Sequence, residues 1–306
     1  MTFDNQKIGV LVGPTGAGKT DLALEWVTQY PKLEIISVDS AMIYRGMDIG
    51  TAKPSAEILR KFPHHLIDIR DPSEAYSVAA FCLDCKNAVQ DIFSRGKVPL
   101  LVGGTMMYLN ALREGLANIP EIPPEIRQKF SEALNQSGIE ALYQKLKKED
   151  PISADRLKST DTQRILRALE VKEATGIPLH EYWKNNQKMI PNPFVFLGIA
   201  TEDRSLLHER IGKRTENMLK NGLIEEVRAL YDRGDLHINL PAIRSLGYRQ
   251  VWEYFLGYSS KNDLYENITI STRQLAKRQL TWMRSWSDIR WISSDLNLME
   301  LFSELF

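Results

Sequence analysis

Eight residues near the start of the chain form a glycine-rich loop that fits the P-loop pattern G-x-x-x-x-G-K-[ST]. They are Gly13-Pro14-Thr15-Gly16-Ala17-Gly18-Lys19-Thr20. The apolar run just before them, at 8–12, predicts a buried strand, and apolar residues at helical spacing after them predict a helix. In that setting backbone N–H groups converge on phosphate oxygens, Lys19 reaches the outer phosphate and Thr20 can bind Mg²⁺. The loop therefore predicts a phosphate site on an α/β fold.

Further apolar runs predict strands that alternate with helices. We expect strands at 34–38, 65–69, 98–102 and 194–200, and a helix at 77–95 that begins at Ser77. The alternation predicts a P-loop NTPase-like core, in which a parallel sheet has helices on both faces. Ligands of such sheets bind beyond the carboxyl ends of the strands. The P-loop, Asp39, Asp68 and Gly103-Gly104-Thr105 all fall at that edge.

The middle of the chain changes character after Gly115. The proline-rich run at 120–124 indicates a linker, and helical periods such as 126–136 and 138–148 follow it as far as residue 188. We therefore predict an all-helical insertion domain at 119–190 between two parts of one core. The first part covers 1–118, and the second covers 191–306 with helices at 203–220 and 264–286.

Composition and charge narrow the class of protein. Of 306 residues, 39 are Lys or Arg and 39 are Asp or Glu, so nucleic-acid binding would need local clusters of charge. No apolar stretch approaches the length of a membrane span, and Met1–Gln6 lack signal-peptide character. We expect a cytoplasmic protein without membrane contact. Cys82 and Cys85 lack the further cysteines of a zinc site, and we expect two small residues on a helix face.

The P-loop predicts phosphate binding but does not define the reaction. A guanine-reading N-K-x-D run is absent, and the strand at 98–102 ends in Gly103-Gly104-Thr105 rather than in an acidic residue. A kinase-like enzyme acting on a small substrate therefore stays open. Asp39, at the end of a strand, is a candidate general base or metal partner, or a cap of the next helix.

Cationic residues cluster in two later segments. Arg164 and Arg167 share one helix face at i, i+3 and could clamp a diphosphate, or form a solvated face. In the predicted helix at 264–286, Arg273, Lys277 and Arg284 fall within about 40° of one another around the axis. This stripe could bind the phosphates of RNA, or could be solvated.

The side of that helix opposite the stripe is apolar, and a neighbouring segment adds an aromatic ring. Leu275, Trp282 and Trp286 are expected to pack against the core. The segment 244–249 adds two arginines and Tyr248, whose ring could stack on an unpaired base.

These runs, in this order, resemble the tRNA dimethylallyltransferases, also called tRNA isopentenyltransferases. The resemblance is carried by Gly13–Thr20, Ser37–Pro54, Gly103-Gly104-Thr105 with Tyr108, Gln163–Arg167, Arg244–Gln250 and Gln274–Trp282. The most specific part is the run from Asp39 to Pro54, which reads D-S-A-x-x-Y-x-G-M-D-I-G-T-A-K-P. Gly16-Ala17 differs from the Ala-Ser of many members, but both pairs are small.

The resemblance implies an activity. Members transfer a dimethylallyl group from dimethylallyl diphosphate to the exocyclic amine of the adenine just 3′ of the anticodon of tRNA, and release diphosphate. It implies Asp39 as general base, Lys19 and Thr105 as further catalytic residues, and Mg²⁺ held with Thr20. The diphosphate would be bound by the P-loop and by Arg167. We expect a monomer whose partners are the anticodon stem-loop of tRNA and dimethylallyl diphosphate.

The resemblance also implies which residues contact tRNA. They are Asp39-Ser40-Ala41-Met42, Thr105, Arg127, Gln163-Arg164-Ile165-Leu166-Arg167, Arg244-Ser245-Leu246-Gly247-Tyr248-Arg249 and Lys277-Arg278-Gln279-Leu280-Thr281-Trp282-Met283-Arg284.

Three other functions remain as alternatives: a P-loop kinase using ATP, a relative that prenylates a free adenine nucleotide, and a nucleotide-gated RNA-binding protein without catalysis. Intact Lys19, Thr20 and Asp39 favour an enzyme over a non-catalytic binding protein. The basic segments near the C-terminus favour tRNA over a free nucleotide, because so small a substrate has no use for them.

Overall fold

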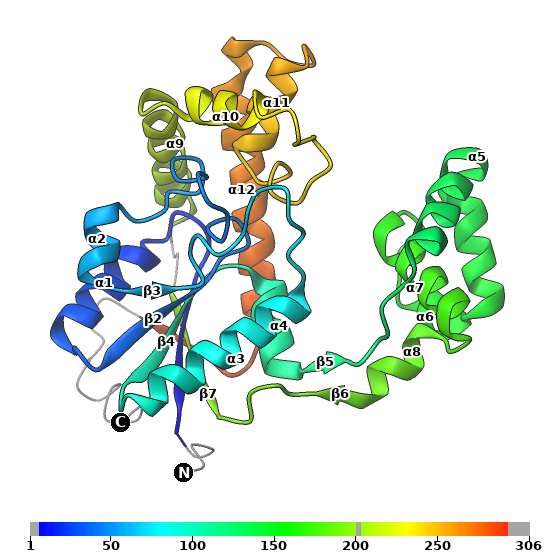
Figure 1. Cartoon of the computed structure of the whole chain (residues 1–306), viewed down its shortest axis with the longest axis horizontal. Helices are drawn as coiled ribbons and strands as arrows, with labels where there is room; N and C mark the ends of the chain where they lie inside the picture. The colour runs from blue at the N-terminus through cyan, green and yellow to red at the C-terminus, as the bar shows by residue number, and fades with distance from the viewer. Residues whose placement is uncertain (1–5, 200–202, 293–306) are drawn as a thin grey trace. The chain divides into compact units, whose positions relative to one another are not determined.

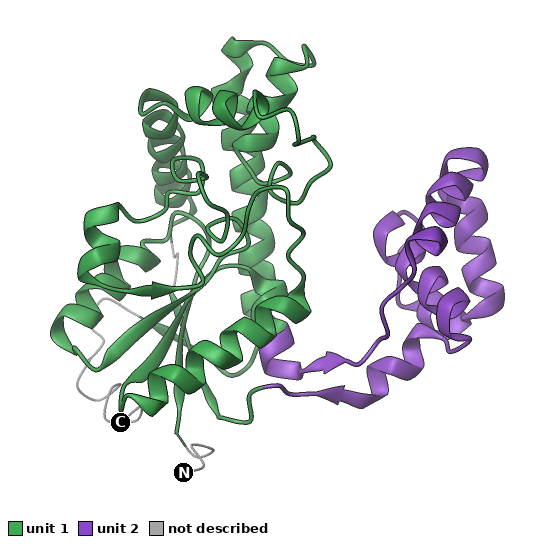
Figure 2. Ribbon diagram, viewed as in Figure 1, with its two compact units in different colours: residues 1–110, 190–306 green, residues 111–189 purple. Residues whose placement is uncertain are grey.

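The chain divides into two compact units. A computed structural model describes residues 6–199 and 203–292. Unit 1 comprises residues 1–110 and 190–306, and unit 2 comprises residues 111–189 (Figure 2). The first division lies before the sequence-based boundary at 118/119. The Met1–Asn5 part of the N-terminal segment and Ala200, the last residue of the strand expected at 194–200, lie outside the described residues.

A six-stranded sheet forms the centre of unit 1 (Figure 1). Its strands are Ile8–Val12 (β1), Leu33–Val38 (β2), His64–His65 (β3), Val98–Gly103 (β4), Phe194–Ile199 (β7) and Ile289–Ile292 (β8). Their order is β3-β2-β4-β1-β7-β8, and every neighbouring pair is parallel. The predicted parallel α/β sheet is confirmed.

Helices cover both faces of this sheet. On one face, Trp26 of the helix Lys19–Gln29 (α1) packs in an apolar cluster that includes Leu11 of β1 and Leu100 of β4. Side chains alternate between the faces of a strand, and the residues next to these, such as Val10 and Leu101, are also fully buried. The helix Val78–Ser94 (α3) contacts β2 and β4. Strands buried on both sides account for the continuous apolar runs in the sequence.

The remaining helices of unit 1 include the two predicted at 203–220 and 264–286 and several that the sequence did not place. They are Ala56–Lys61 (α2), Met106–Glu114 (α4, which crosses into unit 2), Arg204–Lys220 (α9), Leu223–Tyr231 (α10), Tyr248–Phe255 (α11), the short 3₁₀ helix Lys261–Asp263 (η2) and Leu264–Arg284 (α12). Ser77 caps α3 as expected, because its Oγ accepts from the N–H of Ala80 at 3.1 Å. Cys82 and Cys85 lie buried on that helix as free thiols.

Two parts of the sheet differ from the sequence-based prediction. The strand predicted at 65–69 is wrong beyond His65, because Leu66 and Asp68 have φ of 63° and 56°, which an extended strand does not permit. Asp68 therefore lies in a loop, where it pairs with Lys53. Strand β8 was not predicted, and it adds an edge beside β7.

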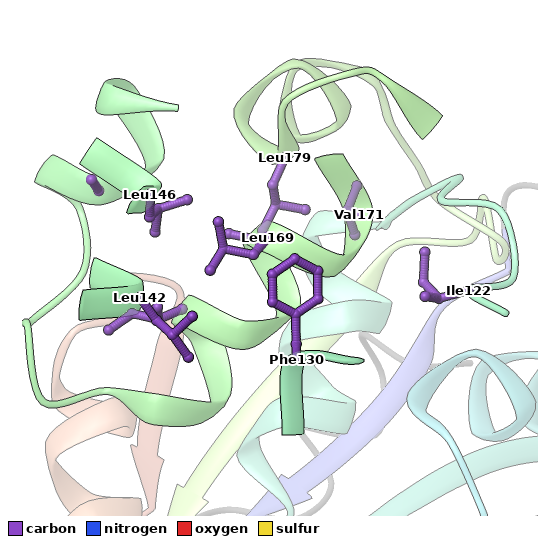
Figure 3. Close-up of a cluster of buried hydrophobic side chains, with 10 residues drawn as sticks. Ile122, Phe130, Leu142, Leu146, Leu169, Val171 and Leu179 are labelled. Atoms are coloured by element: carbon purple, nitrogen blue, oxygen red, sulfur yellow. The ribbon is translucent and has the colours of Figure 1, made fainter. Parts of the chain in front are cut away.

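Unit 2 has a core of its own (Figure 3). Its helices are Pro124–Glu149 (α5), Pro151–Asp155 (α6), Thr162–Thr175 (α7) and Leu179–Tyr182 (α8), followed by the 3₁₀ helix Trp183–Asn185 (η1). Phe130, Leu146 and Leu169 are among the side chains that fill its centre. The helix α5 changes direction at Gly138, whose φ of 75° leaves the helical region.

The two ends of unit 2 pair as a short antiparallel ladder that the sequence analysis did not predict. Leu116–Ala117 (β5), at the end of the predicted first part of the core, lies beside Asn186–Gln187 (β6), which is within the insertion that was expected to be all-helical. Two-residue strands give no periodicity from which they could be recognised. In the described part of the chain, no helix has the length and the apolar character needed to cross a bilayer.

Candidate functional site

Three strands bring the chemically interesting residues to one edge of the sheet. The register sets Val12 of β1 and Val38 of β2 on either side of Gly103 of β4. The residues that come next, Gly13, Asp39 and Gly104, therefore leave the sheet side by side. This is the carboxyl edge at which open parallel sheets bind ligands.

A pocket of about 500 Å³ opens at this edge, and all of its lining belongs to unit 1. Of the residues predicted for the site, it brings together Thr15, Lys19, Thr20, Asp39, Ser40, Ala41, Met42, Thr105, Arg244, Ser245, Leu246, Gly247, Arg278, Gln279 and Trp282. The three residues predicted to be catalytic, Asp39, Lys19 and Thr105, thus lie in one cavity.

The P-loop has the geometry of an anion site. Gly16 and Gly18 have φ of 80° and 88°, a left-handed conformation that bends the loop and turns its amides inward. In the described part of the chain, the N–H groups of Gly16, Gly18, Lys19 and Thr20 have no hydrogen-bond acceptor. The Nζ of Lys19 donates to the carbonyls of Gly13 and Pro14, at 2.9 Å each. The loop therefore offers a row of free donors to a phosphate chain.

The surroundings of Lys19 lower the pKa of its ammonium group. Burial lowers its pKa to about 8, the nearby Arg214 guanidinium acts in the same direction, and the Asp39 carboxylate opposes both. An anion bound beside the two cations would act as the Asp39 carboxylate does and raise the Lys19 pKa. The pocket is thus electrostatically prepared for a negatively charged ligand.

Arg214 is a site residue that the sequence analysis missed. It lies on α9 and in the pocket lining, and its Nη2 donates to the carbonyl of Thr51 at 3.0 Å. Burial lowers its pKa while Asp39 opposes that shift, and no carboxylate in the described part of the chain forms an ion pair with it. A signal was available, because Arg214 lies at i+3 from Ile211 and i−4 from Met218, on the buried stripe of the helix.

Asp39 is held in a tight turn. Its Oδ1 accepts from the N–H groups of Ala41 and Met42, at 2.8 and 3.2 Å. The other oxygen, Oδ2, has no hydrogen-bond donor in the described part of the chain. The Oγ1 of Thr105 accepts from the N–H of Ser40 at 3.1 Å and fixes this turn to the end of β4. The carboxylate therefore has a fixed orientation and one free oxygen.

The pocket can supply some but not all of the ligands of a divalent cation. Thr20 and Asp39 both line it, and a hydroxyl and a carboxylate are ligands that Mg²⁺ accepts. Among residues 6–199 and 203–292, no three Asp, Glu, His or Cys side chains form a metal cluster. The donor set fits an ion held mainly by phosphate oxygens and water, as Mg²⁺ often is in phosphate sites.

Helix α12 presents different faces to the pocket and to solvent. Leu275, Arg278 and Trp282 line the pocket, and Trp286 is buried just after the helix. Lys277 and Arg284 are exposed, as the predicted stripe requires. The other residues of the predicted contact segment divide between solvent and interior: Thr281 is exposed, Leu280 packs on a small apolar cluster and Met283 is buried.

Arg273, the third residue of the predicted stripe, is less exposed than the other two. Arg273 is half-buried, and its charge lies close enough to His208 of α9 to lower the pKa of that imidazole, after the larger effect of burial. The exposed stripe therefore consists of Lys277 and Arg284.

The prediction that Tyr248 stacks on a base is wrong, because its side chain is fully buried. Its hydroxyl donates to the carboxylate of Glu226, and burial and this carboxylate raise the pKa of the phenol. Its ring lies against Gly50, where a Cβ atom would come within 2.5 Å of the ring. Glu226 also accepts from the N–H groups of residues 48, 49 and 50, at 2.8–3.1 Å. This network holds the loop whose Thr51 carbonyl binds Arg214.

The substitution Tyr248→Phe should lower the free energy of unfolding by about 1.5–3 kcal/mol, because a buried hydrogen bond to a charged group is lost. Tyr258, which is 76 % exposed, offers a matched control, and Tyr258→Phe should leave stability unchanged. Urea denaturation of both variants measures the difference. Equal stabilities of the two variants would contradict a structural role for the Tyr248 hydroxyl.

The remaining residues predicted to contact tRNA differ in how far they are buried. Arg249 is exposed and pairs with Glu253 in unit 1. In unit 2, Arg127, Gln163 and Arg164 are exposed, whereas Leu166 packs against the core and Ile165 is fully buried within it. The side chain of Ile165 is therefore not accessible to RNA.

Arg167 is a partly buried cation of unit 2. Burial lowers its pKa, and the charges of Glu170 and Arg127 both act on it, so the three groups are neighbours within that unit. Burial also raises the pKa of Glu170, against the opposing effect of the two arginines.

Comparison with known proteins gives a consistent result. The family model described as IPP transferase matches residues 42–286. A full-length tRNA isopentenylpyrophosphate transferase from Bacillus halodurans is 35% identical, with a TM-score of 0.69, over 98% of this chain and 94% of that one. A tRNA delta(2)-isopentenylpyrophosphate transferase from Staphylococcus epidermidis is 32% identical, with a TM-score of 0.67, over 98% and 97%. A eukaryotic dimethylallyltransferase acting on tRNA is 27% identical, with a TM-score of 0.78, over 94% and 74%.

Proposed function

The chain belongs to the IPP transferase family, and on that premise we propose that it transfers a dimethylallyl group from dimethylallyl diphosphate to tRNA. The acceptor is the exocyclic amine of the adenine immediately 3′ of the anticodon, and the other product is diphosphate. The observation that carries this proposal is a single pocket that combines a P-loop, a carboxylate with a free oxygen and a wall from α12.

The P-loop binds the leaving group. When the bond between the allylic carbon and the diphosphate oxygen breaks, its electron pair stays on that oxygen, and negative charge grows on the diphosphate. Lys19, Arg214 and the free amides of the loop lie where they stabilise this charge. Mg²⁺, held by Thr20 and by phosphate oxygens, supplies further charge neutralisation when it is bound. Arg167 of unit 2 is a further candidate for this role.

Asp39 acts on the acceptor. The exocyclic amine of adenine is a poor nucleophile, because its lone pair is delocalised into the ring. The nitrogen forms a bond to the allylic carbon and gives up one proton, which the free Oδ2 of Asp39 accepts. Thr105 supports the backbone of the turn that orients this carboxylate. The adenine must leave the anticodon-loop stack to reach the pocket.

Two surfaces offer contacts to the rest of the tRNA. Near the pocket these are Arg244, Ser245, Arg278 and Trp282, together with the exposed Lys277 and Arg284 of α12. On unit 2, Arg127, Gln163 and Arg164 are accessible and are candidates for the same partner. Arginine and lysine that meet backbone phosphates supply affinity without reading sequence.

Following a label tests the proposed reaction. The protein is incubated with dimethylallyl diphosphate labelled in the prenyl group, or with γ-labelled ATP, each with and without tRNA. We expect the prenyl label in tRNA, at the adenine 3′ of the anticodon, and no transfer from ATP. Transfer from ATP to a small molecule, transfer of the prenyl group to free AMP, or binding of tRNA without transfer would each contradict the proposal.

The exposed stripe of α12 allows a separate prediction about RNA binding. Exchanging both Lys277 and Arg284 for Gln should weaken binding of cognate and non-cognate tRNA alike. The slope of log affinity against log salt should fall by about one to two units, since each phosphate contact releases slightly less than one counterion. Titrations over a salt series measure this slope.

A matched control uses two exposed lysines at the other edge of the sheet. Lys32 precedes β2 and Lys61 ends α2, away from the pocket. The double variant Lys32→Gln/Lys61→Gln should keep the slope of the unchanged protein. If the Lys277/Arg284 variant keeps it as well, these two residues are a solvated face and do not contact phosphates.

A further inference from the structure

The side chain of Gln279 joins helix α12 to the P-loop and to the end of β4. Its Oε1 accepts from the backbone N–H of Thr15 at 2.8 Å, and its Nε2 donates to the carbonyl of Gly104 at 2.8 Å. Only 7 % of the residue is exposed. Both ends of the carboxamide are thus paired inside the site that binds the diphosphate.

This contact changes which donors of the P-loop a ligand can use. The N–H groups of Gly16, Gly18, Lys19 and Thr20 have no acceptor in the described part of the chain, but the N–H of Thr15 is already occupied. The donors open to a phosphate chain therefore run from the start of α1 back to Gly16, except for the N–H of Ala17, which donates to the carbonyl of Pro14, and they stop before Thr15.

The space beside Thr15 is also filled. A Cβ atom on Gly104 would lie 2.6 Å from the Nε2 of Gln279 and 3.0 Å from the carbonyl oxygen of Gly13. The P-loop, the end of β4 and the Gln279 carboxamide are therefore in close contact at this point. A ligand group can enter here only if Gln279 leaves.

We propose that Gln279 limits the P-loop to a chain of two phosphates and so determines its specificity for a diphosphate over a triphosphate. A third phosphate, running back along the loop from α1, would need the N–H of Thr15 and the space of the carboxamide. Displacing Gln279 would leave its own amide and the Gly104 carbonyl unpaired in a buried place, which is unfavourable. The inference rests on the proposed function and names the residue that fits a P-loop to a prenyl diphosphate.

Charge alone would give the opposite preference. Tripolyphosphate carries more negative charge than diphosphate, so Lys19 and Arg214 attract it more strongly. A site without steric selection would therefore bind the longer anion more tightly. A preference for the shorter anion therefore requires the hydrogen bonds and the packing of Gln279.

Calorimetric titration with two inorganic anions tests this, using diphosphate and tripolyphosphate at the same Mg²⁺ concentration. The unchanged protein should prefer diphosphate by about 10-fold or more, which corresponds to one or two buried hydrogen bonds. In Gln279→Ala the ratio of affinities should shift toward tripolyphosphate by about 10-fold or more. Gln279→Asn, one methylene shorter, cannot span both partners and should shift the ratio in the same direction. Gln274→Ala, at an exposed position of the same helix, should keep the original ratio.

Several results would overturn the inference. One is an unchanged ratio in Gln279→Ala, or in Gln279→Asn if the alanine variant does not fold. An equal loss of affinity for both anions is another, because Gln279 would then be only a support for the loop. A preference of the unchanged protein for tripolyphosphate also excludes the idea. If the unchanged protein binds neither anion, the proposed function fails too, whereas tight diphosphate binding with an unaltered ratio removes only the role of Gln279.

Discussion

Replacement of Asp39 by Asn should lower the rate of prenyl transfer by about 10²- to 10⁴-fold, the usual effect of losing a general base. The carboxamide oxygen of the variant side chain can still accept from the N–H groups of Ala41 and Met42, so the turn should persist. What is lost is the second oxygen as a proton acceptor. Single-turnover transfer with both substrates saturating measures the effect, and the affinity for tRNA should change little.

Asp68 provides the matched control for this experiment. The sequence placed it at the same edge of the sheet, but the structure places it outside the lining of the pocket and paired with Lys53. Asp68→Asn should therefore change the transfer rate by less than about threefold, an effect below about 1 kcal/mol. If Asp39→Asn transfers as fast as Asp68→Asn, Asp39 is not the base.

Loss of the Lys19 charge should have the largest effect on diphosphate binding. Lys19→Ala should weaken the affinity for inorganic diphosphate by about 10- to 100-fold, since a charge-assisted contact is removed from a partly buried site. Affinity for tRNA should remain near that of the unchanged protein. Calorimetric titration measures both, and Lys32→Ala, at an exposed position, serves as the control.

The dependence on pH gives a second measure of the same residue. Burial and Arg214 hold the pKa of Lys19 at about 8, so the residue is charged at about pH 7 and largely neutral at about pH 9. Diphosphate affinity should consequently fall as the pH rises through about 8. In Lys19→Arg this fall should be absent, because arginine stays charged throughout the range. Protonation of diphosphate itself affects both proteins equally. The same fall in affinity in both proteins would therefore assign the fall to a group other than Lys19.

Local patterns in the sequence were sufficient to predict the parts of the site that lie on consecutive residues. The P-loop lies between a strand and a helix as its spacing predicted, and Asp39 and Thr105 follow neighbouring strands. Buried parallel strands give continuous apolar runs, which is why β1, β2 and β4 were placed within a residue of their observed bounds.

The parts that sequence reasoning missed depend on contacts between distant segments. Arg214 reaches the pocket because α9 packs beside it, and Gln279 reaches the P-loop across 264 residues of chain. Tyr248 has an aromatic ring of the kind that stacks on bases, yet it is buried, because its hydroxyl donates to the carboxylate of Glu226 and its ring packs against Gly50. The helical period of α9 places Arg214 on the buried side of that helix, but the partners of these residues are set by tertiary packing, which no local period reveals.

The two faces of α12 also affect how this enzyme can change by mutation. Gln279, Leu275 and Trp282 face the pocket, where Gln279 bonds to the P-loop, and Lys277 and Arg284 face solvent. Neighbouring positions on a helix point about 100° apart, so single substitutions a few residues from one another alter different properties. Substitutions on the pocket face therefore alter the site, whereas those on the solvent face leave it intact, and a library confined to this one helix would sample both faces without disturbing the sheet.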